Sequence, residues 1–99
     1  MIWHIVRFDM THLDETVRRE METSLEGLDA LDEVRWLRVA RDVEDPGVTG
    51  LLTVFDDVDA LARYRVHPDH VPVVARVGEL GIGTTRLDIA TDDASTDLP

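Results

Sequence analysis

The chain of 99 residues is 43% apolar and 31% charged and carries a net charge of −11. We expect one globular domain and no membrane protein, since no apolar run approaches the roughly 20 residues of a membrane span. The absence of cysteine excludes disulfides, thiolate zinc sites and thiol catalysis. The negative charge opposes binding to nucleic acids and anionic lipid surfaces. The N-terminus resembles a strand rather than a signal peptide, so we expect a cytoplasmic protein.

The first predicted elements are a strand over residues 2–8 and a long helix. One face of the strand carries Ile2, His4, Val6 and Phe8. Trp3 and Ile5 make the other face apolar as well, which predicts a central position in a sheet. The helix is expected from about Leu13 to Leu31, with Thr11 and Asp14 forming a capping box at its start.

Two strands, two helices and a last strand are predicted in the remainder. The two strands cover residues 33–43 and 48–55, on either side of an Asp45-Pro46-Gly47 turn. Asp56 or Asp57 can cap a helix that ends near Arg65, and a further helix is expected over residues 71–80. A strand follows over residues 84–90.

This order of elements is that of a ferredoxin-like α+β fold, a split βαβ arrangement with a four-stranded antiparallel sheet. In such a fold the helices cover one face of the sheet, and the other apolar face needs a separate cover. We expect a second copy of the chain there, which makes the protein a homodimer. The domain is expected over residues 1–91, followed by an acidic, disordered tail over residues 92–99.

The segment Tyr64–His70 is the strongest candidate for chemistry, because it places a phenol and two imidazoles within seven residues. Pro68 disfavours helical geometry at His67 and so predicts a helix end or kink there. A histidine with an ordinary pKa near 6.5 can remove an acidic proton next to a carbonyl, and a nearby tyrosine can donate to the enolate oxygen. The alternative is structural: Tyr64 closes the core edge and His70 bonds to backbone.

Other candidate residues carry weaker signals. A metal site at His67, Asp69 and His70 lacks a further ligand, so we expect no metal there. His4 is either a satisfied core residue or a polar group in a cavity. The glycines of residues 78–83 precede a strand, which indicates helix termination rather than a phosphate loop.

The chain resembles the dimeric α/β-barrel family, also called stress-responsive A/B barrel proteins, over about residues 2–90. The resemblance is carried by His4–Phe8, Phe55-Asp56-Asp57 and above all Tyr64–Val71. It implies a homodimer in which two sheets pack face to face into an α+β barrel. Each subunit would keep a cavity between its sheet and its helices.

The last motif is similar to that of the polyketide-cyclase members of the family, of the olivetolic acid cyclase type. Those enzymes close a linear poly-β-ketone by intramolecular aldol condensation, without metal or organic cofactor. The resemblance implies His70 as the catalytic base, Tyr64 as its hydrogen-bonding partner and His4 as a pocket residue. By the same matching and by strand alternation, the expected ligand contacts also include Val6, Phe8 and Leu51.

Three functions follow as alternatives. The first is a cofactor-independent lyase of the cyclase type acting on a β-ketone. The second is a non-catalytic, stress-responsive dimer that binds a small molecule, and the third is a cofactorless oxygenase. Fold alone does not separate them.

Overall fold

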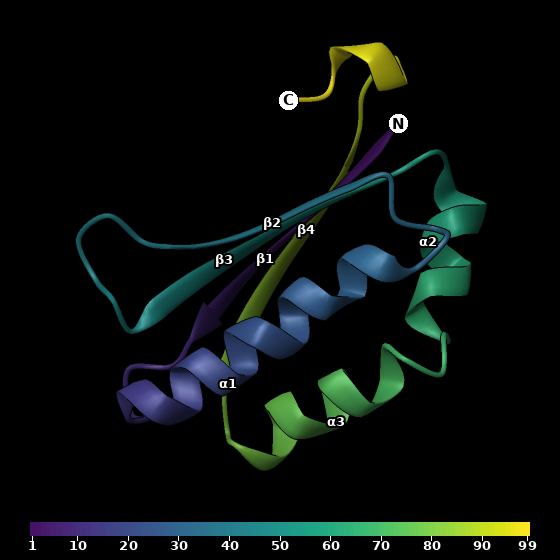
Figure 1. Ribbon diagram of the computed structural model, residues 1–99. Helices are drawn as coiled ribbons and strands as arrows, with labels where there is room; N and C mark the ends of the chain where they lie inside the picture. The colour runs from purple at the N-terminus through teal and green to yellow at the C-terminus, as the bar shows by residue number, and fades with distance from the viewer.

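The computed structural model describes residues 1–99 except for the side chain of Ser95. Four antiparallel strands form one sheet in the order β2-β3-β1-β4 (Figure 1). The strands are β1 (Ile2–Asp9), β2 (Trp36–Arg41), β3 (Val48–Phe55) and β4 (Gly83–Ala90). The predicted ferredoxin-like sheet is confirmed, with β1 at an interior position because both of its faces are apolar.

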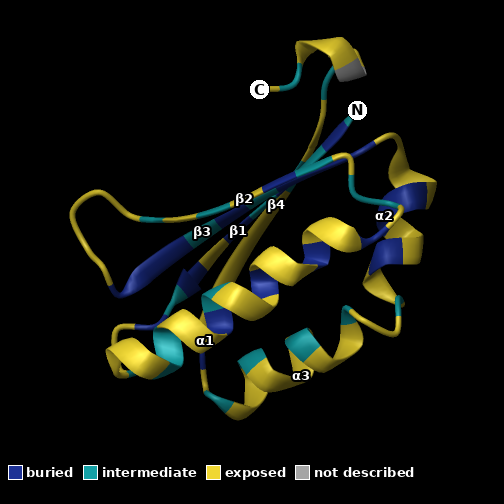
Figure 2. Ribbon diagram, in the orientation of Figure 1, coloured by how far each residue is buried: buried dark blue, intermediate teal, exposed yellow. Residues whose placement is uncertain are grey.

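The helices lie on one face of the sheet, as the split βαβ order requires (Figure 1). They are α1 (Glu15–Glu26), α2 (Val58–Arg65) and α3 (Val71–Glu79). The core forms between α1, α2 and the inner face of the sheet, and the ribbon has buried residues on each of these elements (Figure 2). It includes Val6, Phe8, Met21, Leu25, Leu28, Leu51, Phe55, Leu61 and Tyr64.

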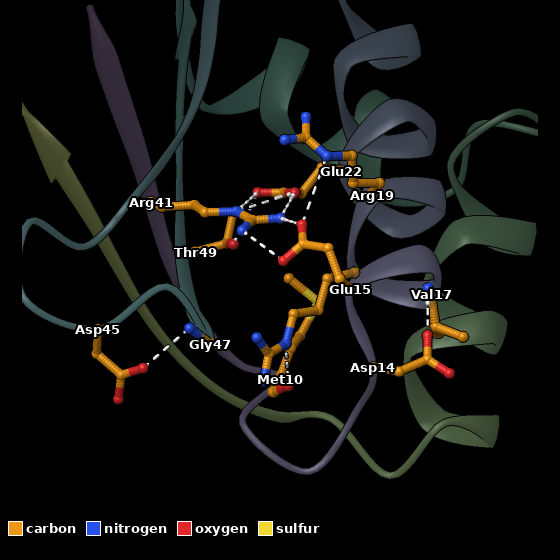
Figure 3. Close-up of polar contacts among 11 residues, drawn as sticks. Met10, Asp14, Glu15, Val17, Arg19, Glu22, Arg41, Asp45, Gly47 and Thr49 are labelled. Atoms are coloured by element: carbon orange, nitrogen blue, oxygen red, sulfur yellow. Dashed lines mark hydrogen bonds and ion pairs between the residues drawn. The ribbon is translucent and has the colours of Figure 1, made fainter.

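The start of α1 differs from the predicted capping box. Asp14 is the N-cap, and its carboxylate accepts a hydrogen bond from the Val17 amide at 2.9 Å (Figure 3). The Thr11 hydroxyl instead donates to Asp9 at 2.7 Å, so Thr11 is not the cap. Aspartate is as good an N-cap as threonine, and here it stands directly before the first helical residue.

Several predicted bounds were too wide. The helix α1 ends at Glu26, and Gly27–Ala30 tighten into a 3₁₀ turn, since glycine weakens helix propagation. The strand β2 begins only at Trp36, because Val34 closes a turn by donating to the Leu31 carbonyl at 3.0 Å. The strand β3 and the helix α2 have the predicted bounds.

The cap of α2 and the C-terminal segment complete the chain. Asp57 caps α2 by accepting from the Ala60 amide at 2.8 Å, while Asp56 pairs with Arg35 at 2.6 Å. A 3₁₀ turn, Ser95–Asp97, follows β4, and the expected domain end at residue 91 stays a prediction. Of the helices within the described residues, none has the length and apolar character that a membrane crossing needs.

A cluster of charged side chains connects α1 to β2, which is an edge strand of the sheet. Arg41, at the end of β2, donates to Glu22 at 2.7 Å and to Glu15 at 3.0 Å (Figure 3). The buried Thr49 hydroxyl of β3 also donates to Glu22, at 3.1 Å. We call Glu15, Glu22, Arg41 and Thr49 the Arg41 cluster. Because each carboxylate has a cationic partner, the cluster holds α1 in a fixed position over the sheet.

The outer face of the sheet carries no helix and is largely apolar. Trp3 of β1 and Trp36 of β2 lie there with ring centroids 5.8 Å apart. On β4, Leu87 and Ile89 are 57% and 40% exposed. An apolar sheet face of this kind needs a cover in the folded protein.

Candidate functional site

A cavity of about 440 Å³ lies between the inner face of the sheet and the helices α1, α2 and α3. This volume is in the range of small-molecule sites. All six residues proposed from the sequence line it: His4, Val6, Phe8, Leu51, Tyr64 and His70. The structure therefore brings them together, while their roles stay predictions.

Tyr64 of α2 forms the floor of the cavity. Its side chain is 1% exposed and packs against Phe55, with ring centroids 4.8 Å apart. The hydroxyl is buried and has no hydrogen-bond partner among the described residues. Burial raises the pKa of Tyr64, so the phenol stays protonated near neutral pH. A buried hydroxyl without a partner is uncommon, and here it offers a donor to a molecule in the cavity.

His70 stands beside Tyr64, with ring centroids 4.2 Å apart and the rings tilted by 36°. The turn at Pro68 brings it there, because the His70 amide donates to the His67 carbonyl at 2.9 Å and α3 begins at the next residue. Its Nδ1 lies 3.2 Å from the Arg65 carbonyl oxygen. A carbonyl only accepts, so Nδ1 carries the proton and Nε2 keeps its lone pair.

Burial lowers the pKa of His70. The hydrogen bond to the Arg65 carbonyl raises it, but by less. The imidazole is therefore neutral near pH 7, which is the form that accepts a proton. The partner that orients His70 is thus a backbone carbonyl. Among the described residues, the Tyr64 hydroxyl makes no hydrogen bond to it.

His4 of β1 contributes a second imidazole to the cavity. It is 6% exposed, and its ring centroid lies 6.0 Å from that of Tyr64. Its cross-strand neighbour on β4 is Asp88, whose carboxylate accepts a hydrogen bond from His4 Nδ1. The bond to Asp88 occupies Nδ1 and leaves Nε2 as the ring nitrogen without a partner among the described residues.

Sequence reasoning missed several residues of this site. Asp88 also pairs with Arg65 at 3.1 Å and with Arg86 at 3.6 Å, and both arginines line the cavity. Three valines of α3 form an apolar wall: Val73, Val74 and Val77. Alternation along β4 could have found Arg86 and Asp88, once β4 was placed next to β1.

The remaining histidines of the motif and the loop have structural partners. His67 Nδ1 accepts a hydrogen bond from the Asp69 amide at 3.0 Å, which matches its predicted role in a turn. His12 bonds to the Leu80 carbonyl at 2.8 Å. Within the described residues, no group of three or more histidine, aspartate or glutamate side chains is placed to hold a metal ion.

The arrangement suits proton transfer next to a carbonyl group. Two imidazoles, of which that of His70 has a free Nε2 lone pair, and one protonated phenol face a cavity with apolar walls. Such groups can remove a proton from carbon and donate a hydrogen bond to the oxygen on which negative charge develops.

The fold and this cavity define a ferredoxin-like α+β protein with a cavity between its sheet and its helices. The sequence profile of the stress responsive A/B barrel domain matches residues 2–90, so the chain belongs to that family. This confirms the resemblance that the motifs indicated. Among curated proteins, none matches the chain.

Solved structures with the same fold include proteins of several descriptions. A family member from Mesorhizobium loti is 24% identical, with a TM-score of 0.75 and coverage of 91% of this chain and 95% of that one. A dimeric ferredoxin-like protein from Thermobifida fusca is 20% identical (TM-score 0.78; 91% and 90% covered). A cofactor-independent oxygenase from Streptomyces nogalater is 13% identical (TM-score 0.77; 94% of each chain covered). At these identities the likeness shows the fold alone.

Proposed function

We propose that the protein is a cofactor-independent enzyme of the polyketide-cyclase type, which closes a β-ketone by intramolecular aldol condensation. One observation carries this proposal: the unpartnered, buried Tyr64 hydroxyl lies beside His70, and both groups face the same cavity. A general base and a hydrogen-bond donor are the two groups that enolate formation requires.

In the proposed reaction, His70 Nε2 takes a proton from a carbon that lies between two carbonyl groups. The Tyr64 hydroxyl donates to the carbonyl oxygen that becomes the enolate oxygen. The enolate carbon then bonds to a distal carbonyl carbon of the same molecule, and that carbonyl oxygen takes up a proton. Loss of one water completes an unsaturated ring, and the protein returns to its starting protonation state.

The walls of the cavity support a reaction of this kind. Val73, Val74 and Val77 face the apolar residues of the sheet across the cavity. An apolar enclosure folds a flexible chain so that its two ends meet, and proximity of this kind supplies much of the rate of an intramolecular reaction. Burial in this enclosure also lowers the pKa of His70 and so keeps its imidazole neutral.

We also infer that the protein is a homodimer in which the outer faces of two sheets cover each other. The exposed Leu87 and Ile89 and the paired Trp3 and Trp36 form the apolar face that such contact would bury. The similar protein from Thermobifida fusca is described as dimeric. Sedimentation equilibrium tests this inference, and a monomer at micromolar concentration would contradict it.

A neutral tetraketide ester tests the proposed reaction. In methyl 3,5,7-trioxooctanoate, C2 lies between two carbonyls and can attack C7 to form a six-membered ring. We expect conversion to methyl 2,4-dihydroxy-6-methylbenzoate and water. Chromatography measures the amount of product over time. His70→Ala should slow turnover about 10²–10⁴-fold, and Tyr64→Phe about 10²-fold, the usual ranges for a general base and an oxyanion donor.

The control variant is His12→Gln, since His12 lies outside the cavity and should keep full turnover. Circular dichroism should show that all variants remain folded. Full turnover in both the His70 and the Tyr64 variants would sink the proposal. Binding of the tetraketide ester without any conversion would leave a ligand-binding dimer, the non-catalytic alternative.

A second candidate is a cofactorless oxygenase, because the fold is shared with a cofactor-independent oxygenase of Streptomyces nogalater. Both reactions begin by forming a carbanion or phenolate in the cavity. They differ in the consumption of oxygen, which an oxygen electrode measures with a dihydroxyaromatic substrate. Oxygen uptake that depends on His70 would favour the oxygenase over the cyclase.

A further inference from the structure

The charged side chains that line the cavity are both basic. Within the described residues, Arg65 and Arg86 are part of the lining and no carboxylate is. This composition is opposite to that of the whole chain, which has 21 acidic and 10 basic residues. The mouth of the cavity therefore carries a positive charge on a strongly acidic protein.

The two arginines reach the cavity from different elements. Arg65 ends α2, and Arg86 lies on β4 opposite Val6, so its side chain emerges on the inner face of the sheet. Both approach Asp88 Oδ2, Arg65 at 3.1 Å and Arg86 at 3.6 Å. One carboxylate thus faces two guanidinium groups, which leaves one positive charge in excess.

The Arg86 side chain makes fewer hydrogen bonds to the described residues than the Arg65 side chain. Its side chain is 60% exposed, and it makes no hydrogen bond within the described residues beyond the ion pair at 3.6 Å. The side chain of Arg65 is 46% exposed and donates one hydrogen bond to Asp88. Each guanidinium carries five N–H donors, so most of them remain available to a bound anion.

We infer that the cavity selects a substrate with a carboxylate, which Arg65 and Arg86 bind at the mouth while the ketone end lies against Tyr64 and His70. This inference rests on the proposed function and adds the substrate class, a β-diketone that carries a carboxylate. The single excess charge matches a carboxylate better than a doubly charged phosphate. A planar guanidinium also matches the two oxygens of a carboxylate.

A matched pair of ligands tests the inference: 4,6-dioxoheptanoate, a β-diketone with a carboxylate, and its neutral methyl ester. Isothermal titration calorimetry at low salt should show that the wild-type protein binds the acid at least about fivefold more tightly than the ester, because a charge-assisted hydrogen bond is the stronger one. The double variant Arg65→Gln/Arg86→Gln should bind both equally. Arg86→Gln alone keeps the pair of Arg65 with Asp88 and should reduce the preference at least about twofold.

The control is Arg63→Gln, which removes the same charge from the same helix. Arg63 pairs with Glu33 at 3.9 Å and does not line the cavity, so the preference for the acid should persist. A wild-type protein that binds the acid no better than the ester, or binds neither, overturns the inference. So does a preference that survives in the double variant, or displacement of the acid by inorganic phosphate at equal ionic strength.

The failure of this inference can be told apart from failure of the proposed function. Turnover of the neutral tetraketide ester depends on Tyr64 and His70 and needs no carboxylate. Turnover without a preference for the acid contradicts the carboxylate site alone. A preference for the acid without turnover supports the carboxylate site and contradicts the enzyme.

Discussion

Two buried threonines on the same face of β3 have opposite surroundings. The Thr49 hydroxyl donates to Glu22 within the Arg41 cluster at 3.1 Å. The Thr53 hydroxyl, opposite His4 in the sheet, has no hydrogen-bond partner among the described residues, and neither does the nearby Tyr64 hydroxyl. The buried hydroxyl at the anchor of α1 has a hydrogen-bond partner, whereas the two buried hydroxyls beside the cavity have none among the described residues. A satisfied hydrogen bond stabilises the fold. Buried hydroxyls without a partner are typical of a site that binds a polar ligand.

The largest effect on stability is expected in the Arg41 cluster. Glu22→Ala removes the partner of both Arg41 and Thr49, and should lower the free energy of unfolding by about 2 kcal/mol, less than for a fully buried pair because the cluster is partly exposed. Glu20→Ala on the exposed side of α1 is the control and should stay within about 0.5 kcal/mol. Urea unfolding measures both. Equal losses in the two variants would contradict the anchoring role.

The same cluster should make the protein sensitive to acid. Hydrogen bonds from Arg41 lower the pKa of Glu22 and Glu15 below the usual value near 4.5. A lowered pKa in the folded state adds stability that is present above the unfolded pKa and is lost as the pH falls through the folded pKa. In Arg41→Gln this contribution should be absent, so unfolding free energy should fall less steeply below pH 4.5. Parallel curves for the two proteins would contradict this expectation.

The two threonines give a matched comparison of smaller size. Thr49→Val should cost about 1 kcal/mol of unfolding free energy, because Glu22 loses a hydrogen bond. Thr53→Val removes a buried hydroxyl that has no partner among the described residues, and should be neutral or stabilising. Both changes keep the shape of the side chain. A larger loss at Thr53 than at Thr49 would reverse the comparison.

The smallest effect on stability is expected at Tyr64, although its effect on turnover is large. Tyr64→Phe keeps the ring contact with Phe55 and removes only the unpartnered hydroxyl. The unfolding free energy should therefore change by less than about 0.5 kcal/mol or rise. Thermal and urea unfolding check this. A marked loss would indicate that the hydroxyl stabilises the fold rather than serving a ligand.

Most of the fold could be predicted from the sequence because its elements have clear periods. Alternation located β1, the Asp45-Pro46-Gly47 turn marked the start of β3, and helical spacing located α1. The errors lie at element ends, where one local interaction decides. Thr11 and Asp14 are both good capping residues, and only the chain path shows that Asp14 stands next to the helix.

The site was predicted in part. The motif placed Tyr64 and His70 side by side, since both belong to one short segment. Asp88 and Arg86 were missed because their place at the site depends on the pairing of β4 with β1, which sets them opposite His4 and Val6, 84 and 80 positions away in the sequence. The orienting carbonyl of Arg65 was missed because a backbone acceptor leaves no mark in a sequence.

The tryptophans and the tyrosine of the chain lie in different parts of the molecule and give different optical signals. Trp3 and Trp36, both tryptophans of the chain, lie together on the outer face of the sheet, while the single tyrosine lies at the cavity. Tryptophan emission therefore reports whatever covers the outer face and is separated from the cavity by the thickness of the sheet. Tyrosine absorption reports the cavity. Assembly and ligand binding can thus be followed independently in one sample, without an added label.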